Sequence, residues 1–142
     1  MKTLYEATST AVGGRSGKVS TEDGKLDLNL SVPKGMGGDG GQGTNPEQLF
    51  GSAYSACFGS AMQLIAEKEK VDIGKDFSVS ATIAIGKTKE GELQLEATLD
   101  CYLPGVDIKT GEDIVNKAHE VCPFSRATRD NITVNLNLLL DE

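Results

Sequence analysis

The stretch from Thr44 to Ala66, TNPEQLFGSAYSACFGSAMQLIA, constrains the fold most strongly. It carries no charged residue from Gln48 onward, yet many of its positions are Gly, Ala or Ser rather than bulky apolar residues. A helix with so little bulk lets a neighbouring backbone approach closely, because the distance between packed elements depends on the side chains at the contact. The sequence therefore predicts a long, central, buried helix that carries Cys57 into the interior.

The start of this helix is marked by a capping signal. Asn45 suits the N-cap position, Pro46 suits the first helical position, and Gln48 completes a capping box. Glu47 lies in the first turn, where the helix dipole favours a carboxylate. These residues predict a helix that begins at Pro46.

A glycine-rich segment, Pro33 to Gly43, precedes the helix. Glycine loses much conformational freedom on folding, so we expect a loop that is either mobile or pinned by other parts of the protein. The segment also matches G-x-G-x-x-G. So many glycines match that pattern by chance, and no βαβ unit surrounds them, which argues against dinucleotide binding.

Alternating apolar residues predict strands on both sides of the central helix. Upstream, the sequence predicts an antiparallel meander of three strands, with a hairpin turn at residues 22–24. The strands are Tyr5 to Val12, Lys18 to Thr21 and the alternating segment KLDLNLSV. Downstream, FSVSATIAI and ELQLEATLDCY form a predicted hairpin. Residues 132–140 alternate again and predict the last strand.

A second helix is predicted before that strand. Thr110 and Asp113 suit a capping box, and Pro123 restricts the residue before it, so the helix should end near Cys122. Residues 124–131 are expected to form a turn-rich connection. The predicted fold is α+β in the order βββ-α-ββ-α-β, with antiparallel sheets packed around the central helix, in a single domain over residues 1–142.

Charge and composition exclude several classes of partner. The net charge is −7, from 14 basic and 21 acidic residues, and no basic run is present. Nucleic acid and anionic membranes are therefore not expected as partners. The first ten residues lack the apolar run of a signal peptide, and the central stretch is too polar to span a membrane, so we expect a soluble, cytoplasmic protein.

The chain contains three cysteines and a single histidine. An odd, sparse set of cysteines without C-x-x-C is not typical of a secreted disulfide framework or of a zinc site, so no metal is expected. Cys101 shares its predicted strand face with apolar residues, which favours a core role. Cys57 could equally fill the core, since free cysteine is among the most buried residue types.

Three features favour a reactive Cys57. Its neighbours are small, Cys122 lies at a predicted helix end, and Arg15 follows a Gly-Gly bend that can direct a guanidinium inward. A thiolate needs such a cation, because burial alone raises the pKa of a thiol. His119 offers an alternative, since it lies one turn before Cys122 and could form a Cys–His pair for acyl transfer, although an exposed helical histidine is the simpler interpretation.

Three segments together carry a family resemblance: GGRSGKV, TNPEQLFGSAYSACF and HEVCPFSRATRDNI. They resemble the organic hydroperoxide resistance (Ohr) proteins, which form a superfamily with the osmotically inducible OsmC proteins. The resemblance covers nearly the whole chain. It implies an intertwined homodimer with active sites at the subunit interface, and a bacterial thiol-dependent peroxidase that reduces organic hydroperoxides without a bound cofactor.

The resemblance also implies the site residues. Cys57 is similar to the cysteine that reacts with the peroxide and Cys122 to the resolving cysteine, while Arg15 and Glu47 are similar to the activating arginine and the carboxylate that holds it. The reductant implied is a dithiol, either dihydrolipoamide or a lipoylated protein. Alternatives are an OsmC-type peroxidase with a different stress role, and a thiol sensor or ligand carrier without enzymatic activity.

The spacing of Glu47 and Cys57 suggests how such a site is shared. The two residues are ten positions apart, which is about 15 Å along a helix, so one Arg15 would have difficulty touching both in the same chain. We expect a composite site, with Arg15 and Glu47 from one subunit and Cys57 and Cys122 from the other.

Overall fold

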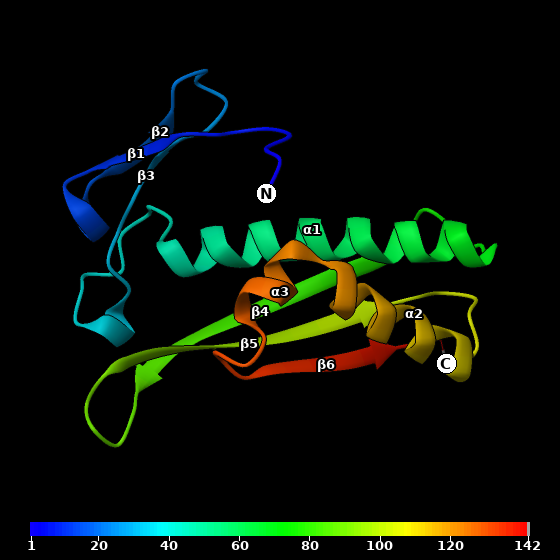
Figure 1. Cartoon of the computed structure of the whole chain (residues 1–142). Coiled ribbons are helices and arrows are strands. Elements are labelled where there is room, and N and C mark those ends of the chain that lie inside the picture. The colour runs from blue at the N-terminus through cyan, green and yellow to red at the C-terminus, as the bar shows by residue number, and fades with distance from the viewer. Residues whose placement is uncertain (142) are drawn as a thin grey trace. The chain divides into compact units, whose positions relative to one another are not determined.

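The computed structural model describes residues 1–141, and its contacts divide the chain into two compact units, Met1–Leu49 and the part from Phe50 onward (Figure 1). The helices and strands confirm the predicted order, with one additional short helix before the last strand. Along the chain they are β1 Ser9–Val12, β2 Lys18–Thr21, β3 Asp27–Asn29, α1 Pro46–Glu69, β4 Ser78–Lys87, β5 Leu93–Tyr102, α2 Ile108–Val121, α3 Pro123–Thr128 and β6 Val134–Leu139. The single domain over 1–142 stays a prediction.

The first unit is built on the antiparallel sheet β1-β2-β3. The strands are shorter than the sequence predicted, because β1 begins only at Ser9 and β3 spans three residues. Of the alternating apolar residues around β3, Leu30 is buried but Leu28 is 39% exposed. The sheet is therefore largely exposed within this chain.

The glycine-rich loop of the first unit is pinned by the segment just before it. The backbone N–H of Gly38 donates to the Pro33 carbonyl at 3.0 Å, and that of Gly43 donates to Ser31 Oγ at 2.8 Å. Gly38 lies so close to the preceding chain that a Cβ atom there would be 2.1 Å from the Val32 carbonyl oxygen. The loop therefore needs glycine at this position because of a close backbone approach.

We expect Gly38→Ala to destabilise the protein by about 2 kcal/mol or more, since the new methyl group meets backbone that cannot move aside cheaply. The matched control is Gly35→Ala in the same loop, where an added Cβ meets nothing within 4 Å. Urea unfolding measures both variants. Equal midpoints for the two variants would contradict this account of the loop.

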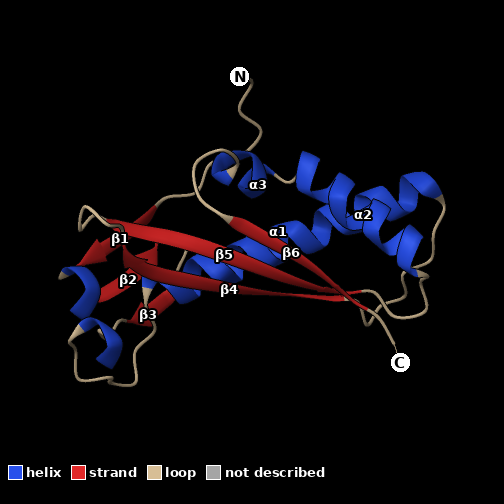
Figure 2. Cartoon of the chain, turned by 90° about the horizontal axis from the view of Figure 1, so that it is seen from below, coloured by secondary structure: helices blue, strands red, loops and turns tan. Residues whose placement is uncertain are grey.

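The second unit packs helices against one face of the sheet β4-β5-β6. In Figure 1 the helical segments lie on one side of the sheet, and in Figure 2, seen from below, α1 passes behind the strands. Alternate residues of β5 point into this layer and are fully buried, among them Ala97, Leu99 and Cys101. The periodicity of two in the sequence thus identified the core face of the strand correctly.

The last strand differs from the prediction of antiparallel sheets. β4 and β5 pair antiparallel, but β6 pairs parallel to β5, so this sheet is mixed. The chain leaves β5, crosses back through α2 and α3, and re-enters the sheet in the same direction. Such a crossover is what a parallel pair requires.

Helix α1 is capped as predicted and is buried on one side. The Gln48 N–H donates to Asn45 Oδ1 at 2.8 Å. Close backbone approach is confirmed at Gly51, where a Cβ would lie 3.1 Å from the Ala81 carbonyl oxygen. The buried face includes Tyr54, Phe58, Met62 and Ile65, whereas the opposite face is exposed and uncharged over Ser52, Ala53, Ala56, Ser60, Gln63 and Leu64.

The structure corrects two predictions around α2, its N-cap residue and the connection that follows it. The N-cap is Asp107, whose carboxylate accepts the Thr110 N–H at 2.7 Å, rather than the predicted Thr110. The predicted end at Cys122 is confirmed, but the expected turn-rich connection begins with the helix α3. Pro123 both ends α2 and occupies the first helical position of α3, where proline is well suited.

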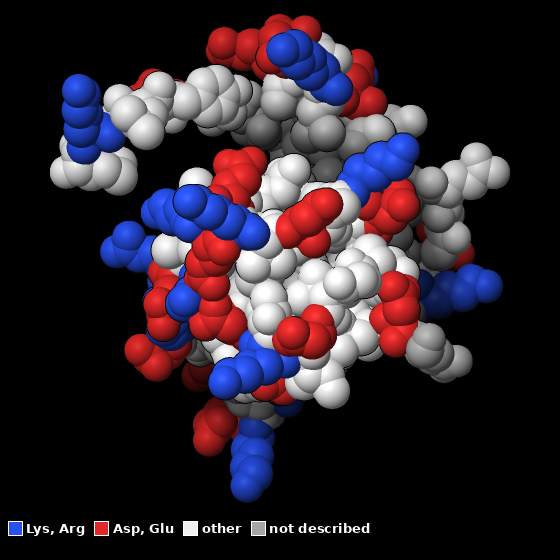
Figure 3. All heavy atoms as spheres, turned by 90° about the vertical axis from the view of Figure 1, so that its right-hand side faces the viewer, with Lys and Arg blue, Asp and Glu red and all other residues white. Residues whose placement is uncertain are grey.

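No helix in residues 1–141 has the length and apolar content needed to cross a membrane. On the face shown in Figure 3, basic and acidic side chains are interspersed, and no continuous basic surface appears there.

Candidate functional site

The second unit brings Cys57 and Cys122 together. Cys57 is half-buried in the middle of α1, and Cys122 is fully buried between α2 and α3. The two thiols lie close enough for Cys122 to raise the pKa of Cys57, and both are free. Two residues 65 positions apart in the sequence thus form a dithiol pair that can close to a disulfide.

The surroundings of Cys57 act on its pKa in opposite directions. Burial raises the pKa of this thiol most strongly, and the charge and hydrogen bond of Cys122 raise it further. The backbone N–H of Phe124, at the start of α3, donates to the Cys57 sulfur and lowers the pKa. The net pKa is raised, so these contacts within the second unit leave the thiol protonated at neutral pH.

The first unit brings Arg15 and Glu47 together in a bidentate ion pair. Arg15 Nη1 donates to Glu47 Oε2 at 2.9 Å, and Nη2 donates to Oε1 at 2.6 Å. Gly13, in the left-handed conformation with φ 82°, turns the chain into the short 3₁₀ helix Gly14–Ser16 that carries the arginine. Two parallel hydrogen bonds fix the plane of the guanidinium as well as its position.

Each residue of the Arg15–Glu47 ion pair favours the charged form of the other. The hydrogen bonds from Arg15 lower the pKa of Glu47, and the same bonds raise the pKa of Arg15. Only 13% of the Glu47 side chain is exposed, compared with 34% of the Arg15 side chain. In this pair the Arg15 guanidinium is therefore partly exposed, whereas the Glu47 carboxylate that balances its charge is more buried. The catalytic roles of both residues stay predictions.

The other two candidates do not join either pair by a hydrogen bond. Cys101 is fully buried in β5, where burial first and the charge of Asp100 second raise its pKa to about 12. His119 is half-buried in α2, and its Nδ1 atom has no hydrogen-bond partner among the described residues. Burial lowers the pKa of His119, so the imidazole is neutral at pH 7. Among the described residues, no hydrogen bond links the His119 side chain to Cys122.

A buried group of hydroxyls beside the dithiol pair was missed by the sequence analysis. The Tyr54 hydroxyl forms hydrogen bonds with Ser125 Oγ at 2.8 Å and Thr128 Oγ1 at 3.2 Å. Tyr54 lies one turn before Cys57, and the other two residues lie on α3. The available signal was a serine and a threonine three residues apart after Pro123, which share a face only if that segment is helical.

The dithiol pair of the second unit allows thiol redox chemistry. Among residues 1–141, no group of three or more His, Cys, Asp or Glu side chains is placed to hold a metal ion. A half-buried thiol next to a second free thiol can be oxidised and then resolved to a disulfide.

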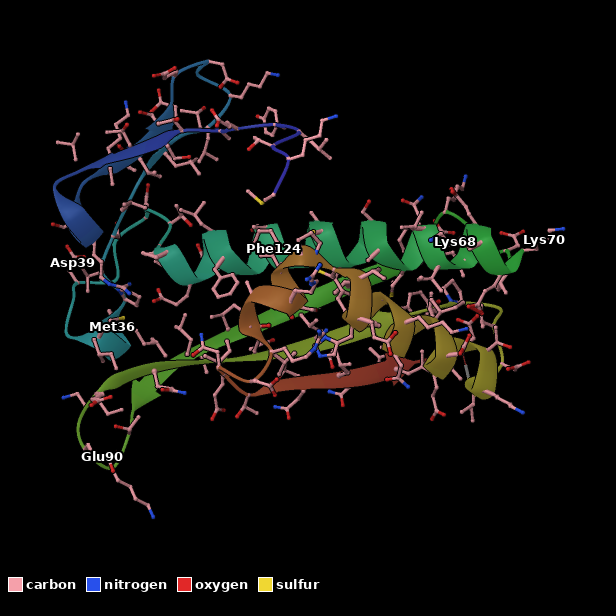
Figure 4. All side chains as sticks on the ribbon, in the orientation of Figure 1. Met36, Asp39, Lys68, Lys70, Glu90 and Phe124 are labelled. Carbon is pink, nitrogen blue, oxygen red and sulfur yellow. The ribbon has the colours of Figure 1, made fainter. Side chains whose placement is uncertain are left out.

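Phe124, labelled in Figure 4, lies where α3 meets α1. The centroid of its ring is 5.9 Å from the centroid of the Tyr54 ring.

Comparison with known proteins places the chain in a family. The family described as OsmC-like protein matches residues 37–137. The organic hydroperoxide resistance protein of Xanthomonas axonopodis pv. citri is 44% identical over 96% of this chain and 96% of its own length. The organic hydroperoxide resistance protein OhrB of Bacillus subtilis is 38% identical over 95% of this chain and 98% of its own length.

A solved structure agrees at the level of the fold. The crystal structure of an organic hydroperoxide resistance protein from Elizabethkingia anophelis superposes with a TM-score of 0.92 at 43% identity, covering 99% of this chain and 100% of that chain. This match confirms the predicted α+β class with the OsmC/Ohr-like fold. The chain therefore belongs to the organic hydroperoxide resistance (Ohr) group of the OsmC/Ohr superfamily.

Proposed function

We propose that this protein is a thiol-dependent peroxidase that reduces organic hydroperoxides to alcohols. The observation that carries the proposal is the contact between two free thiols, Cys57 on α1 and Cys122 at the junction of α2 and α3. Several of the proteins that it matches over nearly their full length are named for resistance to organic hydroperoxides, which supports this substrate class.

The chemistry needs two thiols and no bound cofactor. The Cys57 thiolate attacks one oxygen of the O–O bond, the alkoxide leaves and takes up a proton to give the alcohol, and Cys57 becomes a sulfenic acid. The Cys122 thiol then attacks this sulfur, and water leaves as the disulfide forms. A dithiol reductant returns both electrons by thiol–disulfide exchange. We propose dihydrolipoamide or a lipoylated protein as that reductant.

Arg15 is the proposed activator of the thiolate. The contacts of Cys57 in the second unit raise its pKa on balance, so the attacking form must be stabilised by a cation. Arg15 stays charged at every relevant pH and is held in one orientation by Glu47. A guanidinium fixed in this way loses little freedom when it binds a sulfur anion or a peroxide oxygen.

We further propose that the working form is an intertwined homodimer. In the single chain, apolar side chains of the first unit lie open to solvent, with Leu4 92%, Tyr5 82% and Val12 71% exposed. The exposed face of α1 is free of charge from Ser52 to Leu64. Surfaces of this kind are typical of interaction sites, and a second copy of the chain would cover them.

The dimer also accounts for the spacing of the two pairs along α1. The helix runs unbroken from Pro46 to Glu69, so Glu47 and Cys57 are separated by about 15 Å along its axis. A composite site, with Arg15 and Glu47 from one subunit and Cys57 and Cys122 from its partner, removes the need for one arginine to span this distance.

A steady-state assay tests the proposed function. With dihydrolipoamide as the reductant, we expect turnover of a bulky organic hydroperoxide at a kcat/KM above that for hydrogen peroxide, because the buried, aromatic surroundings of Cys57 suit an apolar leaving group. A single stoichiometric oxidation without turnover would instead identify a thiol sensor. Equal, weak rates for the wild type and Cys57→Ser would end the peroxidase proposal.

A further inference from the structure

The hydroxyl cluster of Tyr54, Ser125 and Thr128 joins the same two helices, α1 and α3, on which Cys57 and Cys122 lie. All three residues have at most 6% of their surface exposed. The Thr128 hydroxyl donates to the Ser125 carbonyl oxygen at 3.1 Å. The side-chain hydroxyls of Ser125 and Thr128 both form hydrogen bonds with the Tyr54 hydroxyl. Buried hydroxyls are costly to leave unpaired, so this closed set of bonds fixes where α3 lies on α1.

The hydroxyl cluster and the Cys57–Cys122 pair lie close together along both helices. On α1, Tyr54 precedes Cys57 by three residues, and residues at this spacing share a face. On α3, Ser125 follows directly after Phe124, whose backbone N–H donates to the Cys57 sulfur. Cys122, whose side chain meets the same sulfur, is the N-cap residue of α3.

Helix α3 depends on such contacts for its position. It spans only six residues, and a helix this short is not stable by itself in water. Its apolar anchor is Phe124, whose ring lies 5.9 Å from that of Tyr54 and 6.3 Å from that of Phe50. Ring packing tolerates sliding, whereas hydrogen bonds at 2.8 to 3.2 Å do not.

We propose that Tyr54 is a positioning residue for the thiol reaction, because its bonds to Ser125 and Thr128 hold α3 so that the Phe124 N–H and the Cys122 thiol both face the Cys57 sulfur. This inference rests on the proposed peroxidase function. Without the hydroxyl cluster, the Phe124 N–H no longer has a fixed direction, and the thiolate and the sulfenate of Cys57 lose a donor. The resolving thiol loses its fixed approach as well.

The alkylation of Cys57 as a function of pH tests the proposal without using peroxide. In a Cys122→Ser background, Tyr54→Phe removes only the hydroxyl. We expect the midpoint of iodoacetamide reaction to rise by roughly half to one pH unit, since one hydrogen bond to the anion is weakened. In the background that retains Cys122, peroxide reduction at pH 7 should slow about two- to fourfold, because a smaller thiolate fraction is partly offset by greater nucleophilicity.

Matched variants separate positioning from general structural damage. Tyr102→Phe removes a hydroxyl that donates to Asp141 at 2.6 Å, outside the cluster, and should leave the midpoint unchanged. Thr128→Val should raise the midpoint, whereas Thr128→Ser, which keeps the hydroxyl, should restore it. If Tyr54→Phe fails to fold by circular dichroism, the Thr128 pair decides the question.

The outcomes distinguish this inference from the peroxidase proposal. An alkylation midpoint in folded Tyr54→Phe equal to that of Tyr102→Phe overturns the positioning role, even if the wild type turns over peroxide. Equal midpoints for Thr128→Val and Thr128→Ser overturn it as well. A wild type that does not reduce peroxide ends the peroxidase proposal instead, whatever the midpoints are.

Discussion

Replacing Cys57 with serine is expected to lower kcat/KM for an organic hydroperoxide by on the order of a thousandfold or more, to the background rate. A serine hydroxyl is not ionised at neutral pH and cannot form the sulfenic acid or the disulfide. The loss should appear in the first turnover as well as in the steady state, because the proposed reaction has no step before the attack by this sulfur.

Cys122→Ser should separate the two half-reactions. The first oxidation of Cys57 should persist in this variant, while turnover with a dithiol falls and mass spectrometry finds sulfenic and sulfinic acids in place of the Cys57–Cys122 disulfide. Cys101→Ala is the matched control, because the Cys101 thiol is fully buried with a pKa of about 12 and should not react. A disulfide that involves Cys101 under native conditions would contradict the assignment.

The second large effect is expected at Arg15. Arg15→Ala should lower kcat/KM by about a hundredfold, the size typical of losing one fixed charge or donor at a reacting centre. Arg15→Lys should recover little of this loss, since an ammonium cannot make the two parallel bonds to Glu47 that orient the group. Lys18→Ala is the control, because the ion pair of Lys18 with Asp27, at 2.7 Å, is more than half exposed on both sides.

The same pair should leave a signature in the pH dependence of stability. Because Arg15 lowers the pKa of Glu47 in the folded chain, the pair stabilises the fold above the ordinary glutamate pKa. This stabilisation is lost as the pH falls through the lowered pKa of Glu47. Glu47→Gln should remove this part of the acid dependence when urea midpoints are compared between neutral and acidic pH.

Mixed dimers test whether the site is composite. When Arg15→Ala and Cys57→Ser chains are unfolded together and reassembled, about half of the dimers should contain one of each chain. In a composite site, one of the two sites in such a dimer has all four residues intact, so about a quarter of the wild-type activity should return. No recovery above the parent variants would show that the pairs do not meet across subunits.

The sequence carried most of the information about local structure. The Asn45 cap, the alternation along β5 and the small residues near Gly51 each have a local physical cause, so each could be read from neighbouring residues. Cys57, Cys122 and Arg15 were singled out as residue types that thiol chemistry needs, and the family resemblance added Glu47 and supplied the individual roles. The structure then joined them into two pairs, in two different units.

The sequence analysis was wrong or incomplete where one local signal fits two structures, and where a pairing depends on distant residues. Pro123 was interpreted only as the end of a helix, although it also begins α3. The N-cap of α2 falls on Asp107 rather than Thr110, because both residue types suit a cap and only the path of the chain from β5 selects one. The direction of β6 could not be inferred, since alternation identifies a strand but not its neighbour or its direction.

The sequence by itself determined all the elements but α3, their order and the presence of a reactive-cysteine pattern, because periodicity, capping and turn chemistry act over a few residues. Only the tertiary structure decided which thiols meet, that β6 runs parallel to β5, and that Tyr54 bonds α3 beside the sulfur. The physical reason is that these contacts join residues 30 or more positions apart, whose pairing depends on how whole elements pack.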